Sequence, residues 1–188
     1  MNEPDERPPR GVLQYIKAIY SRKWVGLLID VCIALLVFAA ISWWQTRDHI
    51  EQGEPAPAFE LQALANIDGG MIASRTLPEK PTVLYFWAPW CTVCKAQSGI
   101  ISTLHEKNGD AYNVLSIALG YEDVASVQQF IQEHEATYPV LLGQPGMERA
   151  WNIEAFPTIY ILDKDATILS STQGFTTRQG ILARLAAH

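Results

Sequence analysis

The stretch that most constrains this fold is an apolar run that ends in two cysteines. Residues 83–95 read Val-Leu-Tyr-Phe-Trp-Ala-Pro-Trp-Cys-Thr-Val-Cys-Lys. The apolar and aromatic first part predicts a buried strand, and residues 95–104 have helical character. Cys91 and Cys94 therefore stand where a strand passes through a tight connection into a helix that the first cysteine opens.

This position gives the two thiols different chemistry. Unpaired backbone N–H groups and the helix dipole favour negative charge at a helix start. We therefore expect Cys91 to be exposed, easily ionised and nucleophilic. Cys94 follows one helical turn later, close enough to attack a mixed disulfide on Cys91 and release the partner. The pair predicts dithiol/disulfide exchange, with Cys91 attacking and Cys94 resolving.

An apolar segment near the N-terminus, residues 24–44, is about as long as the roughly 20 residues that a bilayer-spanning helix requires. Five Lys and Arg residues lie before it, and Arg47 is the only nearby cation after it. The positive-inside rule then places the N-terminus in the cytoplasm and the cysteine pair outside it. A cleaved signal peptide is the alternative, although the run is long for one and Trp43 and Trp44 follow its small residues.

These features divide the chain into four parts. We expect a cytoplasmic tail at 1–23, a single transmembrane helix at 24–44, a polar linker at 45–58 and a folded domain at 59–188. The net charge of −6, with no basic block outside the N-terminal residues, leaves no electrostatic footprint for nucleic acid. Three cysteines are too few for a disulfide framework.

Within 59–188, strand and helix patterns alternate and end in a hairpin and a helix, which predicts an α/β sandwich around a mixed sheet. Asp68-Gly69-Gly70 is the turn of a first hairpin. Besides the central strand, we expect strands at 59–64, 71–72, 113–119, 140–142, 158–162 and 167–172. Besides the helix at 95–104, we expect helices at 122–134, 147–151 and 176–188.

Two motifs carry a family resemblance. The active-site signature of thioredoxins is resembled by Phe86-Trp87-Ala88-x-Trp90-Cys91-x-x-Cys94-Lys95, and their cis-proline loop by Ala155-Phe156-Pro157-Thr158. With the apolar N-terminal segment, the chain resembles the TlpA/ResA/DsbE family of membrane-anchored thioredoxins. Within it, the chain looks closest to the ScsD type of suppressor-of-copper-sensitivity systems. The resemblance implies a thioredoxin-like three-layer sandwich with an N-terminal β-hairpin added before the core.

The resemblance also implies roles for particular residues. Cys91 and Cys94 would be the catalytic pair, with their redox-active disulfide in place of any cofactor or metal. Phe156, before a cis Pro157, would offer backbone hydrogen bonds to an extended substrate chain. The substrate-binding candidates are Trp90, Thr92, Val93, Phe156 and Pro157.

Two positions depart from the resembled pattern. Thr92 and Val93 replace the familiar Gly-Pro or Glu-Pro between the cysteines, so the reduction potential does not follow from the resemblance. Tyr85 stands where many thioredoxins carry a buried acid. A carboxylate proton relay for Cys94 is therefore in doubt, and water or another acid must serve.

The predicted function is a thiol:disulfide oxidoreductase anchored in the inner membrane, with its catalytic domain in the periplasm. The resemblance implies a reductase of protein disulfides, recharged by a membrane electron donor of the DsbD/CcdA type. That compartment is oxidising, so reducing power must be imported. The oxidase direction stays open.

Three other chemistries also use paired cysteines. In a copper(I)-binding or copper-delivery module the two thiolates would capture a soft ion, with His134 as the remote ligand, but such modules usually have three residues between the cysteines. Structural zinc needs two more ligands, which the sequence does not offer. A thiol peroxidase would carry Thr three residues before Cys91, where this chain has Ala88.

Overall fold

The computed structural model describes residues 27–37, 52–68, 70–77 and 79–187. It divides into two units, residues 1–48 and 49–188. In the first unit, residues 27–37 form a helix whose apolar side chains are mostly exposed. Within the described ranges, no helix combines the length and the hydrophobicity that crossing a membrane demands. The predicted tail and the two ends of the predicted span, 24–26 and 38–44, lie outside the described residues.

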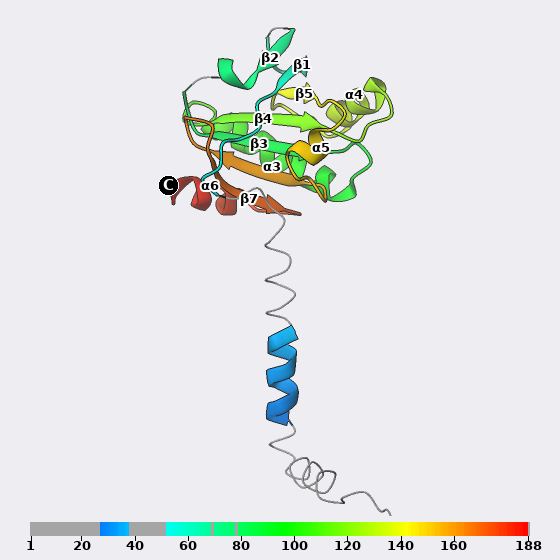
Figure 1. The fold of residues 1–188 in the computed structure, drawn as a ribbon. Coiled ribbons are helices and arrows are strands. Elements are labelled where there is room, and N and C mark those ends of the chain that lie inside the picture. The colour runs from blue at the N-terminus through cyan, green and yellow to red at the C-terminus, as the bar shows by residue number, and fades with distance from the viewer. Residues whose placement is uncertain (1–26, 38–51, 69, 78, 188) are drawn as a thin grey trace, which may run out of the picture. The chain divides into compact units, whose positions relative to one another are not determined.

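The second unit is built on a seven-stranded sheet with the order β2-β1-β5-β4-β3-β6-β7 (Figure 1). β3 is parallel to β4 and β4 to β5, and the other neighbours are antiparallel. This confirms the predicted mixed sheet. The strands are β1 (Glu60–Ala65), β2 (Met71–Ala73), β3 (Thr82–Trp87), β4 (Asn113–Ala118), β5 (Val140–Leu142), β6 (Thr158–Leu162) and β7 (Ile168–Gln173).

The predicted helices are present with shifted ends. The helix after the cysteines begins at residue 92 and runs to residue 108, further in both directions than its pattern indicated. A short 3-10 helix, η1 (Ser74–Thr76), follows the hairpin. The α-helices of this unit are α3 (Thr92–Asn108), α4 (Val124–Glu133), α5 (Met147–Ala150) and α6 (Arg178–Ala186).

All six residues of β3 are buried, and they alternate between two cores. Tyr85 and Trp87 face a core that includes side chains from α3, α4 and α6. Leu84 and Phe86 face a second core, which Met147 of α5 and Trp151 help to close. Successive side chains of a strand point to opposite faces, and a strand covered on both faces is apolar throughout. This is why the run before the cysteines shows no polar alternation.

The first hairpin extends the sheet at one edge. β1 pairs antiparallel with β2 and, on its other side, antiparallel with β5. This confirms the predicted N-terminal β-hairpin. Part of the predicted linker also belongs to the domain, because the backbone N–H groups of Gly53 and Ala56 donate to the carbonyls of Ile168 and Ala166, both at 2.8 Å. Residues 45–51 of that linker lie outside the described residues.

Candidate active site

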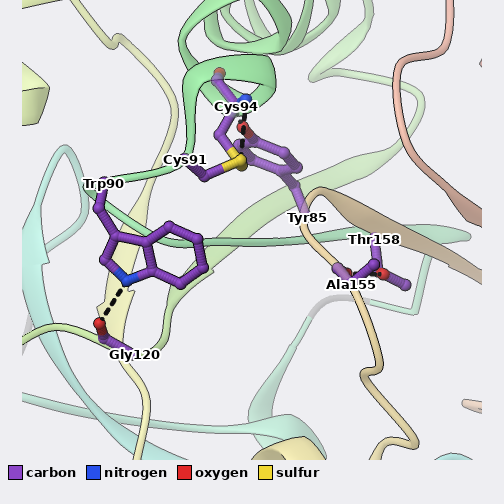
Figure 2. Close-up of a disulfide and its surroundings, with 7 residues drawn as sticks. All are labelled: Tyr85, Trp90, Cys91, Cys94, Gly120, Ala155 and Thr158. Atoms are coloured by element: carbon purple, nitrogen blue, oxygen red, sulfur yellow. Dashed lines mark hydrogen bonds between the residues drawn. A yellow bond between two sulfur atoms is a disulfide. The ribbon is translucent and has the colours of Figure 1, made fainter.

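Cys91 begins helix α3, as predicted. After β3 ends, the chain turns, and the Cys91 N–H closes the turn on the carbonyl of Ala88 at 3.1 Å. Cys91 is the N-cap of α3, and its Sγ accepts a hydrogen bond from the backbone N–H of Cys94 at 3.1 Å (Figure 2). A donor aimed at this sulfur stabilises negative charge on it when the disulfide opens.

Cys91 and Cys94 are joined by a disulfide, with their Cα atoms 5.2 Å apart. Cys94 is fully buried, and Cys91 is only 5% exposed. The prediction of an exposed Cys91 is therefore wrong for this disulfide form. The cause is local, because the cap position turns the Cys91 sulfur inward to meet Cys94, which the helix holds in the core. The neighbouring Trp90, Thr92 and Val93 are exposed.

Trp90 connects the cysteine loop to two other segments. Its indole Nε1 donates to the carbonyl of Gly120 at 2.8 Å (Figure 2). Its ring meets that of Phe156 edge-to-face, with centroids 5.7 Å apart. Gly120 has a φ of +57°, a backbone conformation that other residues rarely adopt. Trp90 is still 66% exposed, so it presents a wide apolar surface beside a nearly hidden sulfur.

The proline loop, residues 155–158, meets the cysteine loop through the contact of the Phe156 ring with Trp90. The Phe156–Pro157 peptide bond is cis, as predicted. Phe156 is half-buried and Pro157 is buried. The Thr158 hydroxyl donates to the carbonyl of Ala155 at 2.7 Å, and the N–H of Gly174 donates to the carbonyl of Pro157 at 2.7 Å. The first bond joins the two ends of the loop, and the second attaches the loop to the residue after β7.

Tyr85 lies beneath the second cysteine, and its hydroxyl donates to the Cys94 carbonyl at 3.1 Å. Burial, with a smaller contribution from neighbouring Tyr138, raises the pKa of Tyr85 well above its usual value. The phenol therefore keeps its proton and acts as a donor, which a carboxylate in the same place would not do. Sequence reasoning noticed Tyr85 only as a missing acid, and it missed Tyr138, which arrives from a distant segment without any local signal.

Possible metal ligands do not cluster in the described part of the chain. In the parts of the chain that the structure describes, no group of three or more His, Cys, Asp or Glu side chains is placed to hold a metal ion. The imidazole of His134 packs on Phe130 at the end of α4, with ring centroids 4.6 Å apart. Lys95 is exposed on α3.

A mixed sheet, a two-cysteine helix start and a facing cis-proline loop define a thioredoxin-like thiol-disulfide oxidoreductase. The chain belongs to the AhpC/TSA family, whose model matches residues 52–171.

Individual relatives agree with this class. The chain is 26% identical over 171 residues to the thioredoxin-like protein YneN of Bacillus subtilis, covering 87% of this chain and 97% of the relative. It is 28% identical over 154 residues to the thiol-disulfide oxidoreductase ResA of Oceanobacillus iheyensis, covering 80% of each. Its fold resembles the crystal structure of the exposed lipoprotein thioredoxin Etrx1 of Streptococcus pneumoniae, with a TM-score of 0.62 and 25% identity, covering 70% of this chain and all of that one.

Proposed function

We propose that this protein is a membrane-anchored reductase of protein disulfides that works on the extracytoplasmic side of the inner membrane. The observation that carries the proposal is the Cys91–Cys94 disulfide at the start of α3. In the reduced protein, Cys91 attacks a client disulfide, and Cys94 then displaces the client as a thiol. The protein returns to the disulfide form, and a membrane donor of the DsbD/CcdA type reduces it again.

The exposed apolar side chains around the disulfide support docking of a protein client. Trp90 is 66% exposed and Val93 is 43% exposed. Half-buried Phe156 packs against Trp90, so the client would meet a continuous aromatic surface before it reaches the sulfur. Backbone groups of the cis-proline loop would then align an extended client segment, as in strand addition.

The reductase direction is tested by the reduction potential. The purified chain is equilibrated in glutathione or dithiothreitol buffers, and the oxidised fraction of the Cys91–Cys94 pair is measured by thiol alkylation. A reductase should have a reduction potential like that of thioredoxin, at about −270 mV, whereas that of a strong oxidant such as DsbA is about −120 mV. A value close to that of DsbA would reverse the proposed direction of electron flow.

Clients are identified by trapping. A Cys94→Ala variant keeps the attacking thiol and removes the resolving one, so mixed disulfides through Cys91 should accumulate in cells. The matched control is Cys91→Ala, which should trap nothing. Equal trapping by both variants would contradict the assignment of Cys91 as the attacking residue.

The anchor at residues 24–44 rests on the length of the apolar run and on the cations that precede it. The tether would hold the catalytic domain near a membrane donor and raise its local concentration there. In intact spheroplasts, a membrane-impermeant maleimide should label the Cys94→Ala variant at Cys91 after reduction. Labelling that appears only after lysis would contradict the extracytoplasmic placement.

A further inference from the structure

Two buried hydroxyl groups hold the helical turn that carries the resolving cysteine. The hydroxyl of Tyr85, from β3, donates to the backbone carbonyl of Cys94 at 3.1 Å (Figure 2). The hydroxyl of Tyr138, which precedes β5, is 2.9 Å from the Oγ of Ser98, within a hydrogen bond. Ser98 follows Cys94 by one turn of α3, so both ends of the same turn are held from outside the helix.

The two phenols also hold each other. Their rings meet edge-to-face with centroids 5.9 Å apart and an interplanar angle of 88°. The position of Tyr138 is fixed in turn by the first hairpin, because Nδ2 of Asn66 donates to the carbonyls of Ala136 at 2.7 Å and Tyr138 at 3.0 Å. Tyr85, Tyr138 and Ser98 are all fully buried.

This group contains no charge. Among the described residues, the buried polar side chains are neutral hydroxyls and one amide, with no buried carboxylate, ammonium or guanidinium. The side chains that hold the Cys94 turn are therefore neutral hydroxyls, which can fix geometry and do not exchange protons with a thiol near neutral pH.

We propose that Tyr85 and Tyr138 are positioning residues for the resolving step, in which they hold the Cys94 turn of α3 while Cys91 carries a mixed disulfide. In that step the Cys94 thiol loses its proton to water and its sulfur attacks the Cys91 sulfur. The Cys91–Cys94 bond forms, the bond from Cys91 to the partner breaks, and the partner leaves as a thiolate. The inference rests on the proposed roles of Cys91 as attacker and Cys94 as resolver.

The contacts of Tyr85 with Cys94 and of Tyr138 with Ser98 together form a clamp on this turn. The clamp matters in the mixed disulfide because the bond between the two cysteines is then absent. Without that bond, the first turn of a helix frays easily. Hydroxyls from β3 and from the segment before β5 keep the attacking sulfur near its target, which lowers the entropy still to be lost in the transition state. Removing one neutral hydrogen bond should slow resolution by about twofold to tenfold. If the same loss disfavours the closed disulfide, a tenfold effect makes the potential less negative by about 30 mV.

The test measures the attack by Cys91 and the resolution by Cys94 separately, because each step releases one coloured thiolate. The full chain carrying Cys32→Ala, which leaves Cys91 and Cys94 as its two thiols, is reduced and mixed in detergent solution with an aromatic disulfide whose thiolate absorbs visible light. Attack by Cys91 releases one thiolate, and resolution by Cys94 releases the second. We expect Tyr85→Phe to slow the second release by about twofold to tenfold and to leave the first unchanged.

A matched control lies on the other face of the sheet. The hydroxyl of Tyr160 is equally buried and donates to the carbonyl of Trp151 at 2.6 Å, but it belongs to the second core. Tyr160→Phe should lower the free energy of unfolding in the same way and leave both releases unchanged. A merely structural role for Tyr85 predicts that the two variants behave alike.

Equal second-release rates for Tyr85→Phe and Tyr160→Phe would overturn the inference, and so would equal slowing of both releases by Tyr85→Phe. If Tyr85→Phe does not fold, Tyr138→Phe and Ser98→Ala remove the other half of the clamp and should give the same selective slowing. If the Cys32→Ala chain with Tyr85 and Tyr138 intact releases only one thiolate, that result would instead overturn the assignment of attacker and resolver itself.

Discussion

Three buried tyrosines predict how the stability of this domain depends on alkaline pH. The side chains of Tyr85, Tyr138 and Tyr160 are fully buried. Burial raises the pKa of all three phenols. The pKa values of Tyr85 and Tyr138 lie well above the ordinary value of 10, and burial together with the negative charge of Glu154 raises the pKa of Tyr160 to about 12. In the unfolded chain the same phenols ionise near pH 10.

The sign of the change in stability with pH follows from the protons bound in the folded and unfolded states. Above pH 10 the unfolded chain loses phenol protons that the folded protein keeps, so the free energy of unfolding falls as pH rises. A tyrosine that stays protonated in the folded protein leaves the free energy of unfolding unchanged below about pH 9 and lowers it by about 1.4 kcal/mol at pH 11. The three together remove about 4 kcal/mol, a large share of the roughly 5–15 kcal/mol of a typical domain.

The assay is urea unfolding of the oxidised domain between pH 7 and pH 11, followed by tryptophan fluorescence. Tyr160→Phe should be less stable than wild type at pH 7 by about 1 kcal/mol, because it loses the hydrogen bond to Trp151. Between pH 9 and pH 11 its loss of stability should be smaller by about 1.4 kcal/mol. Ile161→Val, which lowers stability without removing a titrating group, is the control and should keep the wild-type slope. Parallel curves for wild type and Tyr160→Phe would refute the reasoning.

Three further substitutions separate docking, helix capping and close packing. Trp90→Ala should cost only about 1–2 kcal/mol of stability, since it removes one exposed hydrogen bond and one ring contact. The rate at which this variant reduces a protein client should fall, while its rate with a small aromatic disulfide stays unchanged. Equal losses of both rates would argue against a docking role. Asp123→Ala removes the cap bond from the Ser126 N–H to Oδ1 at 2.7 Å and should lower the free energy of unfolding by about 0.5–2 kcal/mol; an unchanged urea midpoint would contradict this. Gly143→Ala would place a Cβ against the Leu119 side chain and 2.7 Å from the carbonyl oxygen of Ala118, so the thermal midpoint should drop clearly below that of Gly99→Ala, where nothing lies within 4 Å.

Local patterns predicted most of the elements of the domain. The first hairpin, the buried strand β3 and the helix start at Cys91 were each predicted from a few consecutive residues, and the structure confirms all three. The cis bond before Pro157 came from the resemblance to thioredoxins and is also confirmed.

What the sequence did not predict depends on residues far apart in the chain. No periodicity shows that β1 pairs with β5, or that Tyr138 reaches Ser98, since these contacts join segments 40 or more residues apart. The burial of Cys91 was mispredicted because a helix cap is usually exposed, whereas this one is drawn inward by its bond to a core residue. The role of Gly120 was missed for the same reason, because its carbonyl is used by an indole 30 residues away.

In the proposed reaction, the contrast between a 5% exposed cysteine and a 66% exposed tryptophan beside it would determine the order of events. A thiol that collides with the domain at random rarely finds the sulfur, because few directions of approach lead to it. A partner that first rests against the indole is already at the entrance, and its sulfur needs only a short further movement. Free small thiols should therefore exchange slowly with this disulfide, and the proposed docking would make discrimination between partners depend on contact made before any bond between sulfurs changes.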